Sequence, residues 1–469
     1  MAAQPTKKTA PRQGHTGPAH RSQRNIANWF TAFLFADSGR PRKPPTRTDS
    51  PSAGQTAKLA SLSSQKVIVV GGGAAGIFAA ITCAEAAPET EVLVLEKSPQ
   101  CLTKVRLSGG GRCNVTHACF EGREFASRYP RGGQELIGPL QKFSARDTVN
   151  WFAARGVRLK TEHDGRMFPV TDSSQTIIDC LLAAACVAKV KLRTDCGVVA
   201  VQKLDQGFQL HLASGAKLFA HRLLLATGGC RAASLGQFAV SLGHTLEAPV
   251  PSLFTFQIEA AWLRSLAGVS LELAEISVPG TRLCERGPIL VTHWGLSGPA
   301  ILRLSAWGAR QLHGMNYTFP LRVNWLAGQT DDGVLREFQI RRESAGVKLV
   351  VNVPVPPLTA RLWEALVLES GIPEGTRWAA LTRGQAQRLR QLLTECELKV
   401  SGKSLNKDEF VTCGGVRLRE VNFKTMESRL CPGLYFAGEL LDVDGLTGGF
   451  NFQAAWTTGW LAGRAMAGA

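Results

Sequence analysis

The glycine-rich segment near residue 71 constrains the fold of this chain more than any other feature. The β-branched run at residues 66–70 predicts a buried parallel strand, and it leads directly into the turn GGGAAG at residues 71–76. A second apolar strand is expected at residues 92–95, and it ends at Glu96. A strand, a G-x-G-x-x-G turn, a helix, a strand and an acid in this order predict a βαβ unit that binds a dinucleotide.

Each residue of this unit has its own task. Gly71 permits the tight turn, Gly73 lets a pyrophosphate reach the N-terminus of a helix that begins near Ala74, and Gly76 lets that helix pack closely on the strand. Glu96 is placed to bind ribose hydroxyls, and an acid there disfavours the 2′-phosphate of NADP. FAD and NAD both remain compatible with this unit alone.

Three later segments favour FAD. The apolar strand at residues 221–229 ends in Ala-Thr-Gly-Gly, and it follows an alternating stretch at residues 208–212 that fits an antiparallel meander. The strand at residues 433–439 ends in Glu439, a candidate for binding ribityl hydroxyls. The glycine turn that begins at Gly445 opens a helix whose N–H groups would face the electron-rich end of a flavin ring. Each glycine pair alone is as typical of an ordinary turn, but together they indicate one cofactor domain.

Length and charge set looser limits. A chain of 469 residues predicts two or three domains. Residues 1–64 hold ten Lys/Arg and two acids, so they contribute 10 − 2 = +8 of the net charge of +17, and the rest of the chain carries 17 − 8 = +9. A basic excess of this size is more typical of a solvated surface than of a polynucleotide groove, and it also suits an anionic cofactor or substrate.

The 12 cysteines include no C-x-x-C pair, which indicates reduced thiols, no zinc site and no redox dithiol. Cys113 is expected to be a buried structural thiol. No metal site is predicted. No run of 18 apolar residues occurs, so no membrane span is expected.

Residues 1–64 are predicted to be a disordered tail. They are rich in Ala, Ser, Thr, Pro and Arg and poor in acids, which resembles an organelle transit peptide. The apolar stretch at residues 26–35 is too short to span a bilayer. An extension without a targeting role is the alternative, and composition alone does not separate chloroplast from mitochondrion.

Four motifs resemble the BaiN/RdsA (YhiN-like) family of NAD(P)/FAD-dependent oxidoreductases. They are KVRLSGGGRCNVT at 104–116, THWGLSGPA at 292–300, VTCGGV at 411–416 and KTMES at 424–428, and the stretch 438–453 fits the same pattern. The similarity covers roughly residues 65–467. Val105, Arg106 and His117, where many members carry Asn, are similar to the plant and cyanobacterial branch, which favours a plastid over mitochondrion or cytoplasm.

The resemblance implies an α/β fold: a Rossmann-like FAD-binding domain built from both chain ends, with an inserted β-barrel-like domain and a small helical subdomain. The corresponding predicted ranges are 65–250 and 405–469 for the FAD domain and 251–404 for the insertion. Within the insertion, residues 251–355 are expected to be β-rich and residues 356–397 helical. A second G-x-G-x-x-G is absent from the sequence, which argues against a dedicated NAD(P)H domain.

Polar residues beside the glycines complete the candidate site. Gly109–Gly111 are expected to pass close to the cofactor, with Arg112 and Asn114 binding phosphate or substrate; the alternative is a structural turn with Arg112 in a salt bridge. His293 is the candidate acid/base group because imidazole titrates near neutral pH, and a structural hydrogen bond is its alternative. The predicted cofactor-binding residues are Gly71, Gly73, Ala74, Ala75, Gly76, Glu96, Lys97, Gly110, Gly111, Arg112, Asn114, Thr227, Gly228, Gly438, Glu439, Gly448, Gly449 and Asn451.

Asp442 and Asp444 flank the C-terminal glycine turn and are candidate caps of the following turn. The leading functional interpretation is an FAD-dependent oxidoreductase that acts on an unidentified small organic substrate, with NAD(P)H as a candidate electron donor. The alternatives are an RNA-associated FAD protein in nucleic-acid modification and a redox-silent flavin binder. No stable nucleic-acid partner is expected.

Overall fold

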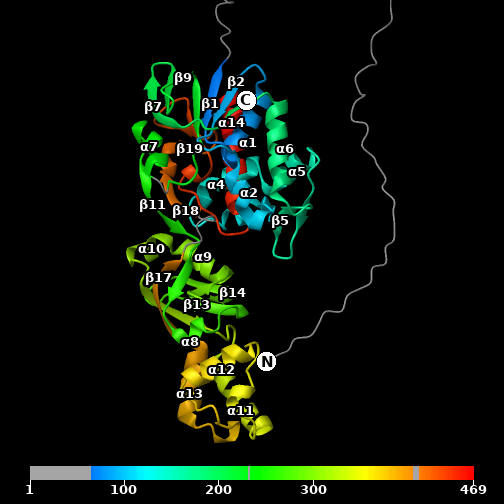
Figure 1. The fold of residues 1–469 in the computed structure, drawn as a ribbon, viewed down its shortest axis with the longest axis vertical. Coiled ribbons are helices and arrows are strands. Elements are labelled where there is room, and N and C mark those ends of the chain that lie inside the picture. Colours follow the sequence, from blue (N-terminus) through cyan, green and yellow to red (C-terminus); the bar gives the residue numbers. More distant parts are fainter. Residues whose placement is uncertain (1–64, 231–232, 405–410) are drawn as a thin grey trace, which may run out of the picture. The chain divides into compact units, whose positions relative to one another are not determined.

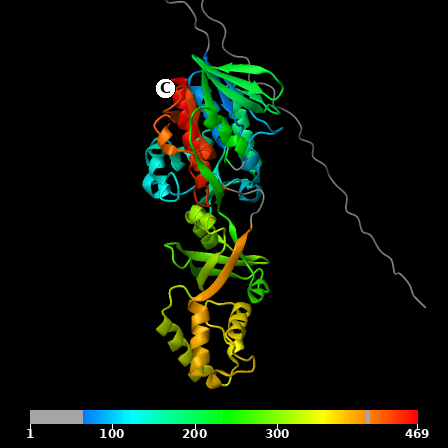
Figure 2. The ribbon, with the colours of Figure 1, turned by 90° about the vertical axis from the view of Figure 1, so that its left-hand side faces the viewer.

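The computed structural model describes residues 65–230, 233–404 and 411–469. The predicted tail and transit peptide, residues 1–64, lie outside the described residues, as do residues 405–410 at the predicted start of the last FAD-domain segment. The described chain divides into a part built around a parallel sheet, a β-barrel and a helical segment (Figures 1 and 2).

A seven-stranded sheet forms the centre of the first part. Its strand order is β19-β20-β21-β10-β1-β2-β6, in which the five strands from β21 to β6 are parallel and the β19–β20 hairpin is antiparallel. Strand β21 from the C-terminal segment lies beside β10, so both ends of the described chain share one sheet. The strands are β1 (Lys66–Val70), β2 (Glu91–Leu95), β6 (Lys191–Arg193), β10 (Arg222–Leu225), β19 (Val421–Asn422), β20 (Glu427–Ser428) and β21 (Leu434–Phe436).

The first and the last described helix pack against each other beside this sheet. Helix α1 (Ala74–Ala86) starts where the sequence predicts, and α14 (Phe450–Ala467) crosses it at close range. Gly459 and Gly463 make this approach possible. A Cβ on Gly459 would lie 2.7 Å from the Ala75 carbonyl oxygen, and a Cβ on Gly463 would lie 2.6 Å from the Ala79 carbonyl oxygen.

Smaller elements surround the sheet. The predicted meander is present as the three-stranded sheet β7–β8–β9, and a second small sheet has the order β3–β5–β4. The bounds are α2 (Thr103–Gly111), β3 (Thr116–His117), α3 (Gly122–Ala126), α4 (Gly133–Lys142), α5 (Ala145–Ala153), β4 (Leu159–Thr161), β5 (Arg166–Pro169), α6 (Ser174–Val187), β7 (Val198–Leu204), β8 (Gly207–Leu212), β9 (Lys217–Ala220) and α7 (Ala233–Ser241).

The inserted barrel is closed, with the strand order β12-β15-β14-β13-β16-β17 and with β17 paired back to β12. Alternate residues of β16 are buried, as expected for a strand with one face in the barrel core. The elements are β12 (Thr255–Ile258), α8 (Ala261–Arg264), β13 (Ser270–Ser277), β14 (Cys284–Thr292), β15 (Gly295–Ser297), α9 (Pro299–Trp307), α10 (Ala309–Gly314), β16 (Phe319–Asn324) and β17 (Cys396–Ser404). Strands β11 (Leu246–Ser252) and β18 (Val411–Val416) pair antiparallel on the two connections to the sheet.

The helical segment begins earlier than the sequence indicates. Residues 251–355 were expected to be strand-rich, but α11 (Asp331–Ala345) lies inside this range. The Thr330 hydroxyl caps this helix by accepting from the Gly333 backbone N–H, and two aspartates stand in its first turn. Helices α12 (Ala360–Glu369) and α13 (Arg383–Thr394) follow, and Leu389 and Leu393 on α13 are buried as the apolar spacing predicts.

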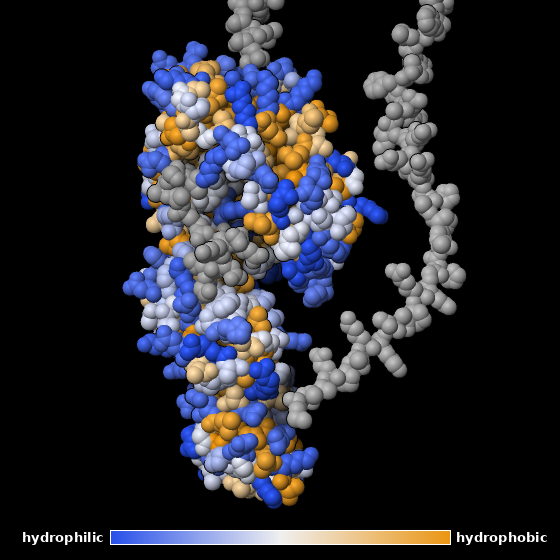
Figure 3. Space-filling model, in the orientation of Figure 1, coloured by the Kyte–Doolittle hydropathy of each residue, from blue (hydrophilic) through white to orange (hydrophobic). Residues whose placement is uncertain are grey.

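The fold class predicted from the sequence is therefore confirmed, while the domain boundaries at residues 250 and 405 stay a prediction. Hydrophobic residues gather in patches over α11–α13 among hydrophilic ones (Figure 3), and Ile340 and Val347 there are 55% and 78% exposed. Within the described residues, no helix is long and apolar enough to cross a membrane.

Candidate cofactor and active site

The carboxyl ends of four parallel strands bring most of the predicted cofactor residues together. Ligands of open α/β sheets bind at this edge. Gly71 follows β1, Glu96 follows β2, Thr227 and Gly228 come after β10, and the segment from Gly438 follows β21. Sequence segments as far apart as residues 71 and 439 therefore meet at one place.

The first glycine turn combines tight packing with open space. A Cβ on Gly71, whose φ is +113°, would lie 2.3 Å from the Ala226 carbonyl oxygen, and a Cβ on Gly76 would lie 2.0 Å from the Gly71 oxygen. A Cβ on Gly73 would meet no atom within 4 Å. Gly73 stands at the N-cap of α1 without a side-chain cap, so the helix N-terminus faces open space that suits a phosphate.

Glu96 is fixed beside this turn. One carboxylate oxygen accepts from the Gly72 backbone N–H at 2.8 Å, and the other accepts from the Ser98 backbone N–H at 2.9 Å. Lys97 is exposed next to it. The carboxylate therefore lies at the carboxyl end of β2, where the sequence pattern predicts the ribose of the adenosine half.

Glu439 joins three elements at the centre of the edge. One carboxylate oxygen accepts from the Thr412 backbone N–H of β18 at 3.1 Å, and the other pairs with the Lys104 ammonium of α2. The backbone of Gly438 approaches α1, since a Cβ placed on this glycine would lie 2.8 Å from that of Ala75. Gly228 has φ +80° and open space in front of it.

The segment from Ser108 to Asn114 forms a glycine loop at the end of α2. Ser108 is extended, and Gly109 and Gly110 are left-handed, so the helix is interrupted there. A Cβ on Gly109 would lie 2.9 Å from the Phe168 ring, whereas Gly110 and Gly111 would meet no atom within 4 Å. The loop thus presents bare backbone on one side.

Arg112 holds the other side of this loop. Its guanidinium pairs with Glu162 at 2.6 Å and with Asp172 at 3.6 Å, and it lies 4.0 Å above the Phe168 ring. The structure therefore shows the salt bridge that the sequence left open as the alternative. In this arrangement Arg112 anchors the glycine loop to the hairpin of β4 and β5.

Two predicted asparagines bind backbone atoms of the site. The Asn114 amide accepts from the Gly449 N–H at 3.0 Å and donates to the Thr116 carbonyl at 3.1 Å. Asn451 binds the backbone N–H and carbonyl of Gly445, at 2.8 and 2.9 Å. Both side chains shape the turn that opens α14, and their roles toward the cofactor stay a prediction.

The same turn is tied to the barrel through two aspartates. Asp444 binds the Arg131 guanidinium, which also donates to the Ala306 carbonyl at the end of α9. Asp442 accepts from Arg310 of α10 at 2.8 Å. From the sequence both aspartates were candidate caps, and neither arginine was singled out. Two acids beside a glycine turn were the only sequence signal for these ion pairs. Their arginine partners could not be identified because they are remote in the sequence.

His293 lies apart from these groups. It occupies the two-residue turn between β14 and β15, where its ring is exposed, and the neighbouring Trp294 indole donates to the Thr255 hydroxyl at 3.1 Å. The described contacts join His293 to none of the predicted cofactor residues. Burial raises the pKa of the Cys113 thiol to about 12, as suits a structural cysteine.

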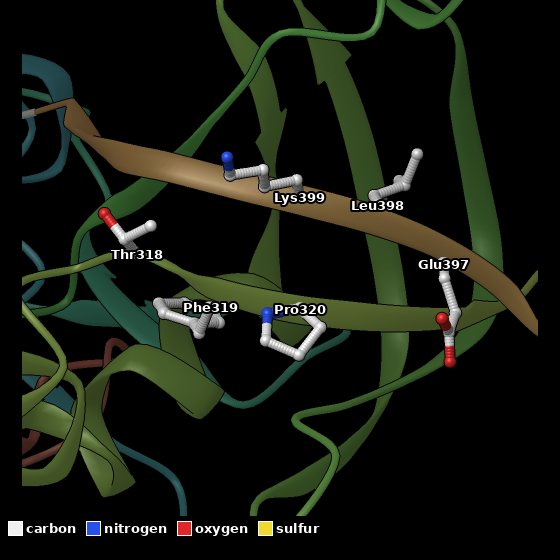
Figure 4. Close-up of a pocket in the computed structure, with 6 residues that line it drawn as sticks. All are labelled: Thr318, Phe319, Pro320, Glu397, Leu398 and Lys399. Atoms are coloured by element: carbon white, nitrogen blue, oxygen red, sulfur yellow. The ribbon is translucent and has the colours of Figure 1, made fainter.

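The residues present fit a dinucleotide cofactor. At Gly73, Gly110, Gly111 and Gly228 the backbone is bare toward open space, so a flat, extended ligand can approach it closely. A separate hollow of about 460 Å³ lies on the barrel, between β16 and β17 (Figure 4), and contains none of the predicted site residues. Among the described residues, no group of three His, Cys, Asp or Glu side chains could hold a metal ion.

Comparison with known proteins identifies relatives that match nearly the whole described chain. Residues 65–465 match the HI0933-like protein Rossmann domain. The chain is 29% identical to the 3-dehydro-bile acid delta(4,6)-reductase of Clostridium scindens, over 86% of this chain and 99% of that protein. It is 30% identical to the ribosomal RNA dihydrouridine synthase of Escherichia coli, over 84% of this chain and 96% of that protein.

Among solved structures, the 3-ketosteroid-delta4-(5alpha)-dehydrogenase of Rhodococcus jostii RHA1 is similar, with a TM-score of 0.47 and 15% identity over 88% of this chain and 99% of that one. The sequence match over most of the chain decides the matter: the chain belongs to the HI0933-like Rossmann-domain family, is an FAD-dependent oxidoreductase as the sequence predicts, and takes FAD as its cofactor.

Proposed function

We propose that this enzyme saturates a carbon–carbon double bond conjugated to a carbonyl group. The observation that carries the proposal is that two kinds of relatives are named for reactions that share this chemistry. One relative is named as a delta(4,6)-reductase of a 3-dehydro-bile acid, and the other as a dihydrouridine synthase. A 3-oxo-Δ4 steroid and a uracil ring both contain a double bond conjugated to a carbonyl, although the molecules differ greatly in shape.

The reaction balances with one hydride and one proton. When bound and reduced, FAD supplies the hydride that adds to the carbon β to the carbonyl. The α carbon takes a proton, so two electrons and two hydrogens enter the substrate. We propose NAD(P)H as the reductant, which is oxidised to NAD(P)⁺. Because the sequence has a single G-x-G-x-x-G, we expect the nicotinamide to bind only transiently.

The chain's own residues would divide the work along the sheet edge. The N-terminus of α1 at Gly73 would bind the pyrophosphate, and Glu96 would bind the adenosine ribose. Glu439, held by Lys104 and by the β18 backbone, would bind the ribityl chain. The backbone N–H groups at the start of α14, which follows the turn at Gly448, would stabilise negative charge on the reduced flavin.

His293 is our candidate proton donor. An imidazole nitrogen can donate a proton in catalysis, and His293 is exposed, so a substrate can reach it.

The test is an anaerobic titration of the full-length flavoprotein. NADPH and then NADH are added while the absorbance of the flavin is followed, and a 3-oxo-Δ4 steroid or another enone is added afterwards. We expect bleaching by a nicotinamide, recovery of the oxidised spectrum by the enone, and a saturated product. A flavin that is reduced but that no conjugated alkene reoxidises would overturn the proposal.

Uridine in RNA is the second candidate substrate. The ribosomal RNA dihydrouridine synthases among the relatives favour it. The same titration distinguishes a small enone from RNA as the substrate. If RNA reoxidises the reduced flavin and acquires dihydrouridine, while free enones do not react, the substrate is a polynucleotide. Binding that weakens steeply with salt would accompany this result.

For residues 1–64 we propose a plastid-targeting role, based on their composition. Fusion of this segment to a fluorescent protein tests it. Accumulation in plastids supports the proposal, whereas accumulation in mitochondria or cytoplasm rejects it.

A further inference from the structure

Thr412 carries a buried hydroxyl group without a partner. The residue lies on β18 and is 1% exposed, yet its Oγ1 atom forms no hydrogen bond with the described residues. Buried hydroxyls in native proteins are almost always hydrogen-bonded, because leaving one unsatisfied lowers stability. An exception of this kind calls for a group that binds there.

The surroundings of this hydroxyl belong to the cofactor edge. The Thr412 backbone N–H donates to Glu439. A Cβ placed on Gly229 would lie 2.6 Å from the Thr412 Oγ1 atom and 3.0 Å from a Glu439 carboxylate oxygen. The hydroxyl therefore lies beside the carboxyl ends of β10 and β21, where the predicted FAD-binding segments meet.

Two glycines of the same strand hold Thr412 in this position. A Cβ on Gly414 would lie 2.6 Å from the Ala248 carbonyl oxygen, and one on Gly415 would lie 2.4 Å from that of Leu440. Both glycines have positive φ, so β18 closes tightly against β11 and the segment after Glu439. The motif VTCGGV thus delivers one hydroxyl to the sheet edge on the chain's return from the barrel.

We propose that the Thr412 hydroxyl hydrogen-bonds to bound FAD. A threonine hydroxyl both donates and accepts, so it can pair with a phosphate, a hydroxyl or a ring atom of the cofactor. The contact would give the Thr412 hydroxyl its missing hydrogen bond. It would also make FAD binding depend on β18, the strand that follows the barrel. It concerns FAD alone and is therefore independent of the substrate.

The test compares Thr412→Val with Thr412→Ser in the full-length holoenzyme. Valine keeps the volume and removes the hydroxyl, whereas serine keeps the hydroxyl. We expect FAD to dissociate from T412V about 3 to 10 times faster after dilution, which corresponds to the loss of one net hydrogen bond, and from T412S close to the wild-type rate. Flavin fluorescence after dilution measures this rate without any substrate.

Thr394→Val is the matched control, because the Thr394 hydroxyl is also buried but has partners in Asp331 and the Arg390 carbonyl. This variant should unfold at a lower temperature and keep its FAD release rate. T412V should release FAD faster than the wild type, and its unfolding temperature should fall only as far as the weaker FAD binding requires. Wild-type FAD release from T412V would overturn the proposal, and so would a T412S variant that loses FAD as fast as T412V.

Discussion

Arg131 and Asp444 lie 313 residues apart in the sequence and form a two-pronged ion pair, in which the Arg131 Nε atom is 2.5 Å from one carboxylate oxygen and Nη2 binds the other. The Asp444 side chain is fully buried and that of Arg131 is 12% exposed. The Ser252 hydroxyl donates to the same carboxylate at 2.8 Å. This pair joins the turn before α14, strand β11 and helix α9.

Removing the charge of Asp444 should therefore be costly. Asp444→Asn leaves the Arg131 charge buried without its partner, so we expect the free energy of unfolding to fall by about 3–5 kcal/mol and flavin to be lost more readily. Asp442→Asn is the control: its partner Arg310 is 46% exposed and can be hydrated, so the expected loss is about 1 kcal/mol. If chemical unfolding showed equal losses of unfolding free energy in D444N and D442N, the burial of the Arg131–Asp444 pair would be unimportant for stability.

Two glycines of the first turn should respond differently to alanine. Gly71→Ala forces a Cβ against the Ala226 carbonyl oxygen at a positive φ, so we expect a protein that folds poorly. Gly73→Ala meets open space, so the unfolding temperature should stay near that of the wild type while the flavin content falls. The flavin-to-protein absorbance ratio measures the flavin content. Full flavin content in G73A would show that Gly73 does not contact the cofactor.

Arg112 should act through the loop that it anchors. Arg112→Ala removes a half-buried ion pair and a cation–π contact, and it loosens the glycine loop. Glu162→Gln weakens the same anchor without touching the arginine. We expect both variants to lose flavin at a similar, moderately increased rate. A much larger effect of R112A would instead indicate direct contact with the cofactor.

His293→Gln tests the proton donor. If the imidazole protonates the substrate, turnover should fall about 100-fold or more. The flavin spectrum and the unfolding temperature should stay unchanged, because the His293 side chain is exposed. Trp294→Phe serves as a neighbouring control for distortion of the turn. Full turnover in H293Q would show that water or another residue donates the proton.

Stability should fall on mild acidification. Burial lowers the pKa of His244 below its usual 6.5, although the facing Glu420 carboxylate acts in the opposite direction; the ring also contacts the Ser428 hydroxyl at 2.8 Å. Below that usual value the unfolded chain binds a proton that the folded chain does not, so acid favours unfolding. His244→Gln should flatten the dependence of unfolding free energy on pH between about pH 5 and 7. Equal slopes in the two proteins would contradict this assignment.

Local sequence signals predicted the parts of the site that local geometry controls. The βαβ unit follows from a short stretch in which strand, glycines and acid stand in fixed order, and the structure shows β1, α1 and β2 there. The pairs of Lys104 with Glu439 and Arg131 with Asp444 are separated by 335 and 313 residues, so no local pattern reveals them.

Two of the predicted site residues make contacts that the sequence did not specify. Asn114 and Asn451 are polar residues close to glycines, which suits a ligand contact and a turn-stabilising contact equally well. The structure shows the turn-stabilising contacts. Helix α11 was missed because its apolar spacing is weak, and its boundary is set by the Thr330 cap.

The position of β21 and α14 at the centre of the first part has a consequence for synthesis on the ribosome. Translation completes all six barrel strands before it reaches β21, which must pair with β10, and α14, which must cover α1. Domains generally fold as units as they emerge. The barrel can therefore fold while the nascent chain is still growing, whereas the cofactor half must wait with an exposed sheet until its last helix leaves the exit tunnel.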